Sequence, residues 1–297
     1  LQYIKQTWHG YAKSFLMKAN DIGWQLKTSR GFIDSSGFSD RAAEIVQIAA
    51  RGRDNNDIFS RYIKPKGPIS FEATHYTGLK VKDDGYLYRY ETKMDTVPTQ
   101  DALKDFVQFV SSYNKPKLVA HNGRSFDFKV LYNNLVRNGL WLEFTDKISG
   151  CIDTIEVFRA LKPKLPGGHT LGNLITNVLG SGYVFDAHNA VGDVQALKDL
   201  VSTVSENDLK DHVFDISEAE ADVTLKVLVD LKIISGGMKK KMVKAGITLA
   251  KLRSSFLENG EKGVAELLSE KDSKGICKVT KSKSIIESIS RHLAQEK

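Results

Sequence analysis

The sequence has few cysteines, no long apolar run, no internal repeat and no low-complexity tract. Its two cysteines, Cys151 and Cys277, are far apart and fit neither a disulfide framework nor a zinc-binding pattern. No apolar stretch approaches the roughly 20 residues that span a bilayer, so we expect no membrane span. The N-terminal region also lacks the apolar core of a secretory signal. These absences favour a nuclear or cytoplasmic protein with reduced thiols.

Charge is distributed unevenly along the chain. The whole sequence of 297 residues carries 43 Lys and Arg against 36 Asp and Glu, a net charge of +7. Residues 225–297 hold 16 Lys and Arg and 8 Asp and Glu, so this quarter carries +8 and the rest of the chain −1. The excess points either to a polyanionic partner, nucleic acid above all, or to a solvated basic surface.

Three regions differ in their sequence patterns. Residues 1–25 are predicted to be a helical or irregular extension, and the start at Leu1 rather than Met favours a fragment or a processed product. Residues 26–205 begin with a strand meander and then alternate helix-like and strand-like runs. This predicts an α/β domain whose mixed sheet is flanked by helices. Residues 206–297 lose the strand pattern and predict a small, basic, all-helical domain, for which homodimer formation is one alternative role.

A carboxylate follows a predicted strand in the middle of the α/β region. The apolar run Lys117-Leu-Val-Ala120 is broken by His121-Asn-Gly, and a pattern with helical spacing follows Asp127. An isolated Asp in this position is most simply a helix cap. A second segment, His188-Asn-Ala-Val-Gly-Asp193, changes that interpretation. It places another carboxylate on a helix that would pack on the same sheet.

These residue types suit metal-dependent hydrolysis. Mg²⁺ and Mn²⁺ prefer carboxylate oxygens, and a pair of such ions polarises a phosphodiester and creates a hydroxide nucleophile. A histidine next to small residues can swing toward a substrate, and it is a suitable general base because its pKa lies near neutrality. We therefore interpret Asp127 and Asp193 as candidate metal ligands and His188 as the candidate base.

Both segments resemble motifs of a known family. His121 to Asp127 and His188 to Asp193 are similar to the second and third motifs of the DEDDh 3′→5′ exonuclease superfamily, which has an RNase H-like fold. The resemblance covers roughly residues 30–204 and is greatest to the repair-exonuclease branch and the exonuclease-like segment of promyelocytic leukaemia protein relatives. It implies hydrolysis at the 3′ ends of single-stranded DNA or RNA with Mg²⁺ or Mn²⁺. The C-terminal region, from Ser235 to Gly246 in particular, is similar to the tail of some exonuclease-like relatives.

The first motif of that family, Asp-x-Glu-Thr-Thr-Gly, is altered here. One alignment places Asp34 at the Glu and Phe32 at the Asp, and the other places Asp34 at the Asp and Ser36 at the Glu. Either way Asp34 is the one carboxylate left, and the loss of a ligand should weaken metal binding. Three interpretations stay open: an inactive pseudonuclease that binds nucleic acid, a first motif interrupted at a fragment edge of an active protein, or slow turnover with a single ion.

Candidate nucleic-acid contacts fall into three groups. By the resemblance, the residues after the first motif line the site of the terminal nucleotide. Residues within the second motif are candidates for phosphate contact. A lysine cluster in the helical region either binds phosphates or forms a solvated helix face. In chain order these candidates are Gly37, Phe38, Asn122, Arg124, Lys239, Lys240, Lys241 and Lys244.

Overall fold

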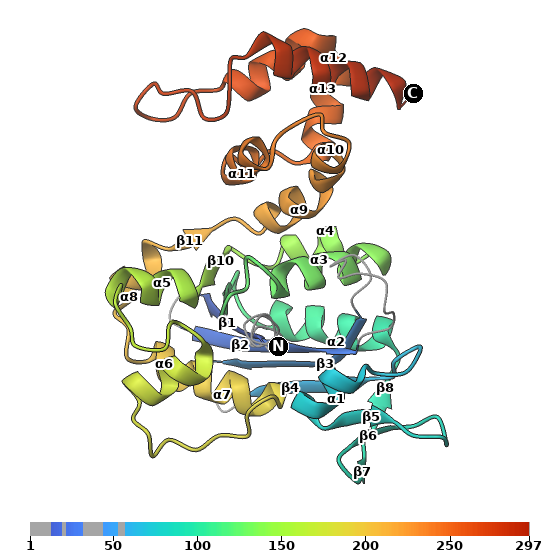
Figure 1. The fold of residues 1–297 in the computed structure, drawn as a ribbon, viewed down its shortest axis with the longest axis vertical. Helices are drawn as coiled ribbons and strands as arrows, with labels where there is room; N and C mark the ends of the chain where they lie inside the picture. Colours follow the sequence, from blue (N-terminus) through green and yellow to red (C-terminus); the bar gives the residue numbers. More distant parts are fainter. Residues whose placement is uncertain (1–12, 20–21, 32–43, 53–56, 297) are drawn as a thin grey trace, which may run out of the picture. The chain divides into compact units, whose positions relative to one another are not determined.

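The computed structural model describes residues 13–19, 22–31, 44–52 and 57–296, and these form two compact units (Figure 1). The first unit ends at Phe214 and the second begins at Asp215. This division lies beyond the predicted boundary at 205/206, because residues 213–214 form a strand that pairs with the sheet of the first unit. Within the described residues, no helix is long and apolar enough to cross a membrane.

An eight-stranded mixed sheet forms the centre of the first unit, in the order β11-β10-β9-β1-β2-β3-β4-β8. Each neighbouring pair among strands β1 to β4 is antiparallel, whereas β9 and β10 are parallel to each other. The predicted α/β class with a mixed sheet is confirmed. The strands are β1 (Lys13–Ala19), β2 (Ile22–Gly31), β3 (Glu44–Gly52), β4 (Ile58–Ile63), β8 (Thr96–Val97), β9 (Lys117–Ala120), β10 (Gly150–Asp153) and β11 (Val213–Phe214).

The predicted helical or irregular N-terminal extension is wrong for residues 13–19 and 22–25. Instead of helical or irregular chain, the structure has β1 and the start of β2, paired antiparallel from Lys13↔Thr28 to Ala19↔Ile22. Leu, Met, Lys and Ala in this stretch favour a helix by propensity, but pairing of β1 with both β2 and β9 overrides that weak preference.

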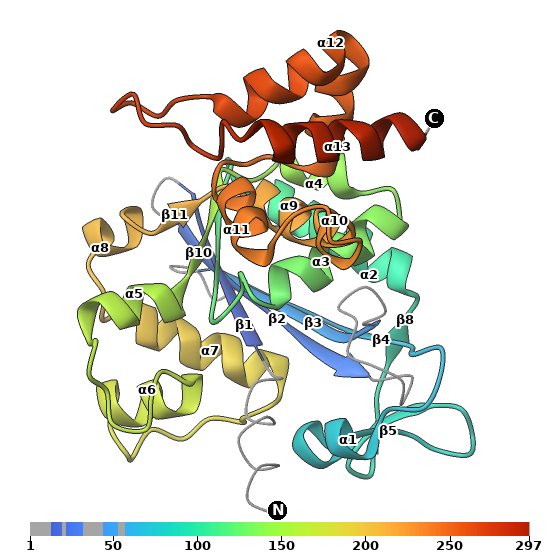
Figure 2. The same ribbon diagram turned by 45° about the horizontal axis from the view of Figure 1, so that its top comes forward.

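Helices cover both faces of the sheet (Figures 1 and 2). On one face, aromatic packing joins Phe106 to Phe59 and to Phe144. On the other face, a buried apolar cluster contains Val119 and Ile152 of the sheet together with residues of four helices. The helices on the first face are α2 (Thr99–Ser111), α3 (Asp127–Arg137) and α4 (Trp141–Thr145). Those that contribute to the apolar cluster on the other face are α5 (Thr154–Leu161), α6 (Leu171–Val178), α7 (Ala190–Val201) and α8 (Glu206–Lys210), which precedes β11.

Local signals set most of these helix boundaries. Thr170 caps α6 through its side chain, and Trp141 is a core residue. Thr99 is the first residue of α2, and Pro98 precedes it without a side-chain cap. Pro at this position fixes the backbone before the helix and has no N–H to satisfy.

A small substructure is attached beside β4 and β8. The helix α1 (Phe71–Thr77) is capped by the Ser70 side chain and ends at Gly78, which has a left-handed backbone. A three-stranded antiparallel sheet follows, made of β5 (Leu79–Val81), β6 (Leu87–Arg89) and β7 (Thr92–Lys93). Leu79 and Leu87 bury their side chains with Val46 of β3, which fixes this substructure on the main sheet.

The second unit is helical, as predicted. Its core combines residues of all five helices, among them Ala221, Leu228, Met242, Leu252 and Leu293. One helical run of this unit is kinked at Gly260, which has a φ of 58°. The helices are α9 (Ser217–Thr224), α10 (Lys226–Asp230), α11 (Gly236–Lys244), α12 (Leu249–Ser269) and α13 (Lys283–Gln295).

Candidate active site

Asp127 lies in the loop-to-helix junction that follows β9. It is the first residue of α3 and its side chain is completely buried. No side chain caps the helix at Phe126. Asp127 lies in the first turn, where the positive end of the helix dipole stabilises a negative charge. Gly123 makes the tight loop feasible. A Cβ at this position would lie 2.5 Å from both the Ala120 Cβ and the Phe128 ring.

Asp153 holds this loop in place. Its carboxylate caps α5 through Ile155 N at 3.1 Å and also accepts hydrogen bonds from Asn122 N at 2.6 Å and Arg124 N at 3.0 Å. Burial raises the pKa of Asp153 to about 6, while the three backbone hydrogen bonds oppose that rise. Asp153 therefore connects β10 to the second motif, in addition to the helix-capping role that the sequence suggested.

His121 has a structural place in the same junction. Its Nδ1 lies 2.9 Å from the Thr154 hydroxyl and its Nε2 lies 2.9 Å from the His169 carbonyl oxygen. A carbonyl can only accept, so Nε2 donates to the His169 oxygen, and the Thr154 hydroxyl in turn donates to the Ala120 carbonyl oxygen at 3.3 Å. The ring is buried. His121 thus joins the end of β9 to the loop before α6.

His188 and Asp193 lie together at the start of α7. Asn189 caps this helix through Val191 N, and the His188 N–H donates to Asp193 Oδ1 at 3.3 Å. His188 has a φ of 65°, an uncommon backbone conformation for a residue with a side chain. The Asp193 carboxylate is buried in the first turn of the helix. The contact joins the His188 backbone, not its imidazole, to the Asp193 carboxylate.

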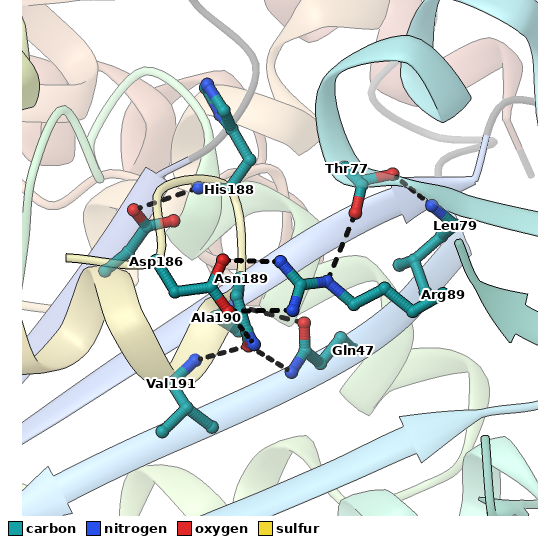
Figure 3. Close-up of polar contacts among 10 residues, drawn as sticks. Gln47, Thr77, Leu79, Arg89, Asp186, His188, Asn189, Ala190 and Val191 are labelled. Carbon is teal, nitrogen blue, oxygen red and sulfur yellow. Dashed lines mark hydrogen bonds and ion pairs between the residues drawn. The ribbon is translucent and has the colours of Figure 1, made fainter. Parts of the chain in front are cut away.

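A polar network anchors this segment to the sheet (Figure 3). Gln47 of β3 donates to Asn189 Oδ1 at 3.0 Å and accepts from Ala190 N at 3.1 Å. Asn189 donates to Asp186 Oδ2, and Asp186 receives both terminal nitrogens of Arg89 at 2.7 and 2.6 Å. The network ties β3, β6 and the approach to α7 into one framework around His188.

Sequence reasoning missed this network. A Gln inside the apolar strand Glu44-Ile-Val-Gln-Ile-Ala-Ala50 was the one available signal, because a buried amide needs partners. Arg89 and Asp186 are 97 residues apart and carry no local signature. Their contact could be found only once the fold had placed β6 beside the segment before α7.

The three candidate metal ligands are not all described by the structure. Asp34 lies outside the described residues, as do Phe32, Ser36, Gly37 and Phe38. Across the described part of the chain, no group of three or more His, Cys, Asp or Glu side chains is arranged to hold a metal ion. Asp127 and Asp193 each offer the carboxylate oxygens that Mg²⁺ and Mn²⁺ prefer, so their donor chemistry fits these ions.

Two candidate nucleic-acid contacts in the second motif have structural roles. Asn122 has a φ of 62° and its N–H is held by Asp153. The Arg124 guanidinium lies 3.6 Å from the centre of the Phe214 ring, and its Nε donates to Glu156 at 3.2 Å. Arg124 therefore already has stacking and ion-pair partners within the protein.

The predicted lysine cluster lies on α11 in the second unit. Lys239 is largely buried and pairs with Asp222 at 3.0 Å, so its ammonium is engaged within the unit. Lys240, Lys241 and Lys244 are exposed on the same helix. The acidic start of α9, at Glu218, Glu220 and Asp222, reduces the charge excess around them.

A family model described as PML, C-terminal domain, matches residues 223–296. The matched stretch lies within the second unit and includes α10 to α13. No curated protein matches the chain.

Proposed function

We propose that the first unit is a metal-dependent 3′→5′ exonuclease of RNase H-like fold. The observation that carries this proposal is the start of α7, where His188 directly precedes a helix and its N–H contacts the buried Asp193. Asp127 adds a second buried carboxylate at the start of α3. Burial of two carboxylates is costly unless hydrogen bonds or cations compensate it, which is the usual situation of a metal-binding acid.

In this proposal Asp127 and Asp193 hold Mg²⁺ or Mn²⁺ together with Asp34. The bound ions would polarise the phosphodiester and activate a water molecule. His188 accepts a proton from the attacking water, since a neutral imidazole is the suitable base near pH 7. Asp153 and Gln47 position the two segments: Asp153 fixes the loop before Asp127, and Gln47 fixes the N-terminus of α7.

Nuclease assays with the full chain test the proposal. A 5′-labelled single strand with Mn²⁺ should give a ladder that shortens from the 3′ end, and a 3′-phosphate should block it. Asp127→Asn and Asp193→Asn should each reduce the rate by about 100-fold or more. Asp101→Asn, in the exposed first turn of α2, is the matched control and should retain the wild-type rate. Product formation that survives Asp127→Asn would contradict the assignment.

A second candidate function is nucleic-acid binding without cleavage, favoured by the single carboxylate of the first motif and by exposed Lys240, Lys241 and Lys244. It predicts an affinity that falls steeply with salt. Replacing all three lysines by Gln should weaken binding and reduce the slope of log Kd against log salt by about 2–3. The control removes the same charge elsewhere in the unit, at exposed Lys262, Lys274 and Lys283. Equal losses in both triple variants would indicate a net-charge effect rather than a site.

A further inference from the structure

The helix α1 exposes aromatic rings instead of burying them. Phe71 is 82% exposed and Tyr76 40%, and His75 between them is also exposed. Thr77 lies on the inward side of α1, where it is buried and its hydroxyl donates to the Ala73 carbonyl oxygen. Concentrating large apolar surface in water on so short a helix is unfavourable unless a ligand covers it, and exposed apolar patches commonly mark binding sites.

The exposed rings form a continuous row that ends at His188. The Phe71 and His75 rings are 6.5 Å apart at an interplanar angle of 22°, which is a stacked arrangement. Next, His75 meets the edge of Tyr76 at 5.3 Å, and Tyr76 lies 5.8 Å from the His188 ring. The row therefore leads from solvent to the candidate general base.

The row is held rigidly on its inner side. At the end of α1, Gly78 contacts the Tyr90 ring so closely that a Cβ there would lie 2.6 Å from it. Arg89 donates to Thr77 O at 3.4 Å and forms the ion pair with Asp186 (Figure 3). The same side chain thus fixes the C-terminal end of α1 and the segment that leads to His188.

We propose that Phe71, His75 and Tyr76 form a stacking platform for unpaired bases of a nucleic-acid strand whose 3′ end lies at His188. The position of that end rests on the proposed exonuclease function, whereas the stacking surface itself does not. Aromatic rings stack on any base, so such a platform binds without sequence preference. A duplex hides its base faces within the stack, and the platform therefore selects single strands of either DNA or RNA.

Fluorescence of 2-aminopurine in short oligonucleotides tests the platform without cleavage. In full-length protein with Asp127→Asn, binding of a single strand should quench 2-aminopurine placed near the 3′ end. Phe71→Ala should raise the Kd roughly five-fold to a hundred-fold and remove most of the quenching. Phe71→Trp should restore both, and Leu142→Ala, which removes another exposed side chain (78%) on α4, should change neither. Because Phe71 is exposed, its replacement should leave the unfolding transition in place.

The results separate the platform from the nuclease activity. An unchanged Kd and unchanged quenching in Phe71→Ala would overturn the platform, and so would equal affinity for a blunt duplex and a single strand. If quenching depends on Phe71 but the protein with its native Asp127 has no nuclease activity, the platform is supported and the exonuclease proposal is contradicted. In an active protein, Phe71→Ala should raise KM more than it lowers kcat. DNA and RNA strands tested in parallel show which sugar the platform accepts, and Phe71-dependent quenching with either one supports the proposal.

Discussion

At the scale of single residues, burial and hydrogen bonding act in opposite directions on Asp153. Burial favours its neutral form, whereas three backbone N–H groups favour its carboxylate. The net result is a pKa near 6, above the ordinary value of 3.8. A native state that binds its proton more tightly than the unfolded chain is stabilised at low pH. That contribution is fully present below pH 3.8 and is lost as the pH rises toward and through 6.

The first prediction follows from this shift. The contribution of Asp153 to the unfolding free energy should fall by about 2 kcal/mol as the pH rises from about 4 to 6.5. Asp153→Asn cannot titrate, so the difference in stability between wild type and variant should change across this window and stay constant above pH 7. Urea denaturation at several pH values measures it. A difference that is independent of pH would show that the hydrogen bonds cancel the effect of burial on the pKa of this residue.

Gly192 gives a prediction whose sign opposes helix propensity. It lies within α7, where Ala is normally about 1 kcal/mol better than Gly. A Cβ at Gly192, however, would lie 2.3 Å from the Asp186 carbonyl oxygen. Gly192→Ala should therefore destabilise the protein by about 1–3 kcal/mol, because the segment before His188 must move.

Gly172 provides the matched control for that experiment. It also lies inside a helix, α6, but it is exposed and nothing lies within 4 Å of its Cβ position. Gly172→Ala should stabilise the protein by about 0.5–1 kcal/mol. Thermal or urea unfolding of both variants decides the matter, and a stabilising Gly192→Ala would mean that the approach to α7 is not tightly packed.

At the scale of elements, α7 depends on a side chain from β3. Gln47 is buried and supplies both an acceptor to Ala190 N and a donor to Asn189. Gln47→Leu keeps the volume similar but leaves a buried N–H without its acceptor, which should cost about 1–3 kcal/mol. Gln108→Leu on the exposed side of α2 should change stability by less than about 0.5 kcal/mol. Similar small effects of both substitutions in urea unfolding would show that Gln47 does not anchor the helix.

The elements also show what the sequence alone could predict. The apolar spacing of Leu103, Phe106 and Val110 was sufficient for α2, and the kink at Gly260 followed from residue type. Strand β1 was missed because its stability comes from pairing with β2 and β9, which no local pattern reveals. In the candidate site, the sequence pattern placed Asp193 on a helix with His188 just before it, as the structure has them. The links through Gln47 and Arg89 depend on contacts across 142 and 97 residues.

At the scale of the whole molecule, the basic excess is smaller when charge is counted over the whole second unit than over residues 225–297. The basic excess of residues 225–297 is partly offset by four acidic residues at the start of the second unit, Asp215, Glu218, Glu220 and Asp222. The second unit as a whole, residues 215–297, then has 16 basic and 12 acidic residues. Its capacity to bind a polyanion therefore depends on where its exposed lysines lie more than on its net charge.

The second unit has a core of its own, and this leads to the last prediction. Residues of α9 to α13 bury their apolar side chains against one another, with Ile289 and Leu252 completely buried. A fragment of residues 215–297 should therefore show a helical circular dichroism spectrum and unfold cooperatively in urea.

Two variants of the fragment test whether this core is the same in isolation. Ile289→Ala should cost about 2–5 kcal/mol, both in the fragment and in the corresponding transition of the full chain. Leu257→Ala, on an exposed part of α12, should cost less than about 0.5 kcal/mol in either context. A fragment without cooperative unfolding, or an Ile289→Ala effect seen only in the full chain, would show that the helical unit needs the rest of the protein to fold.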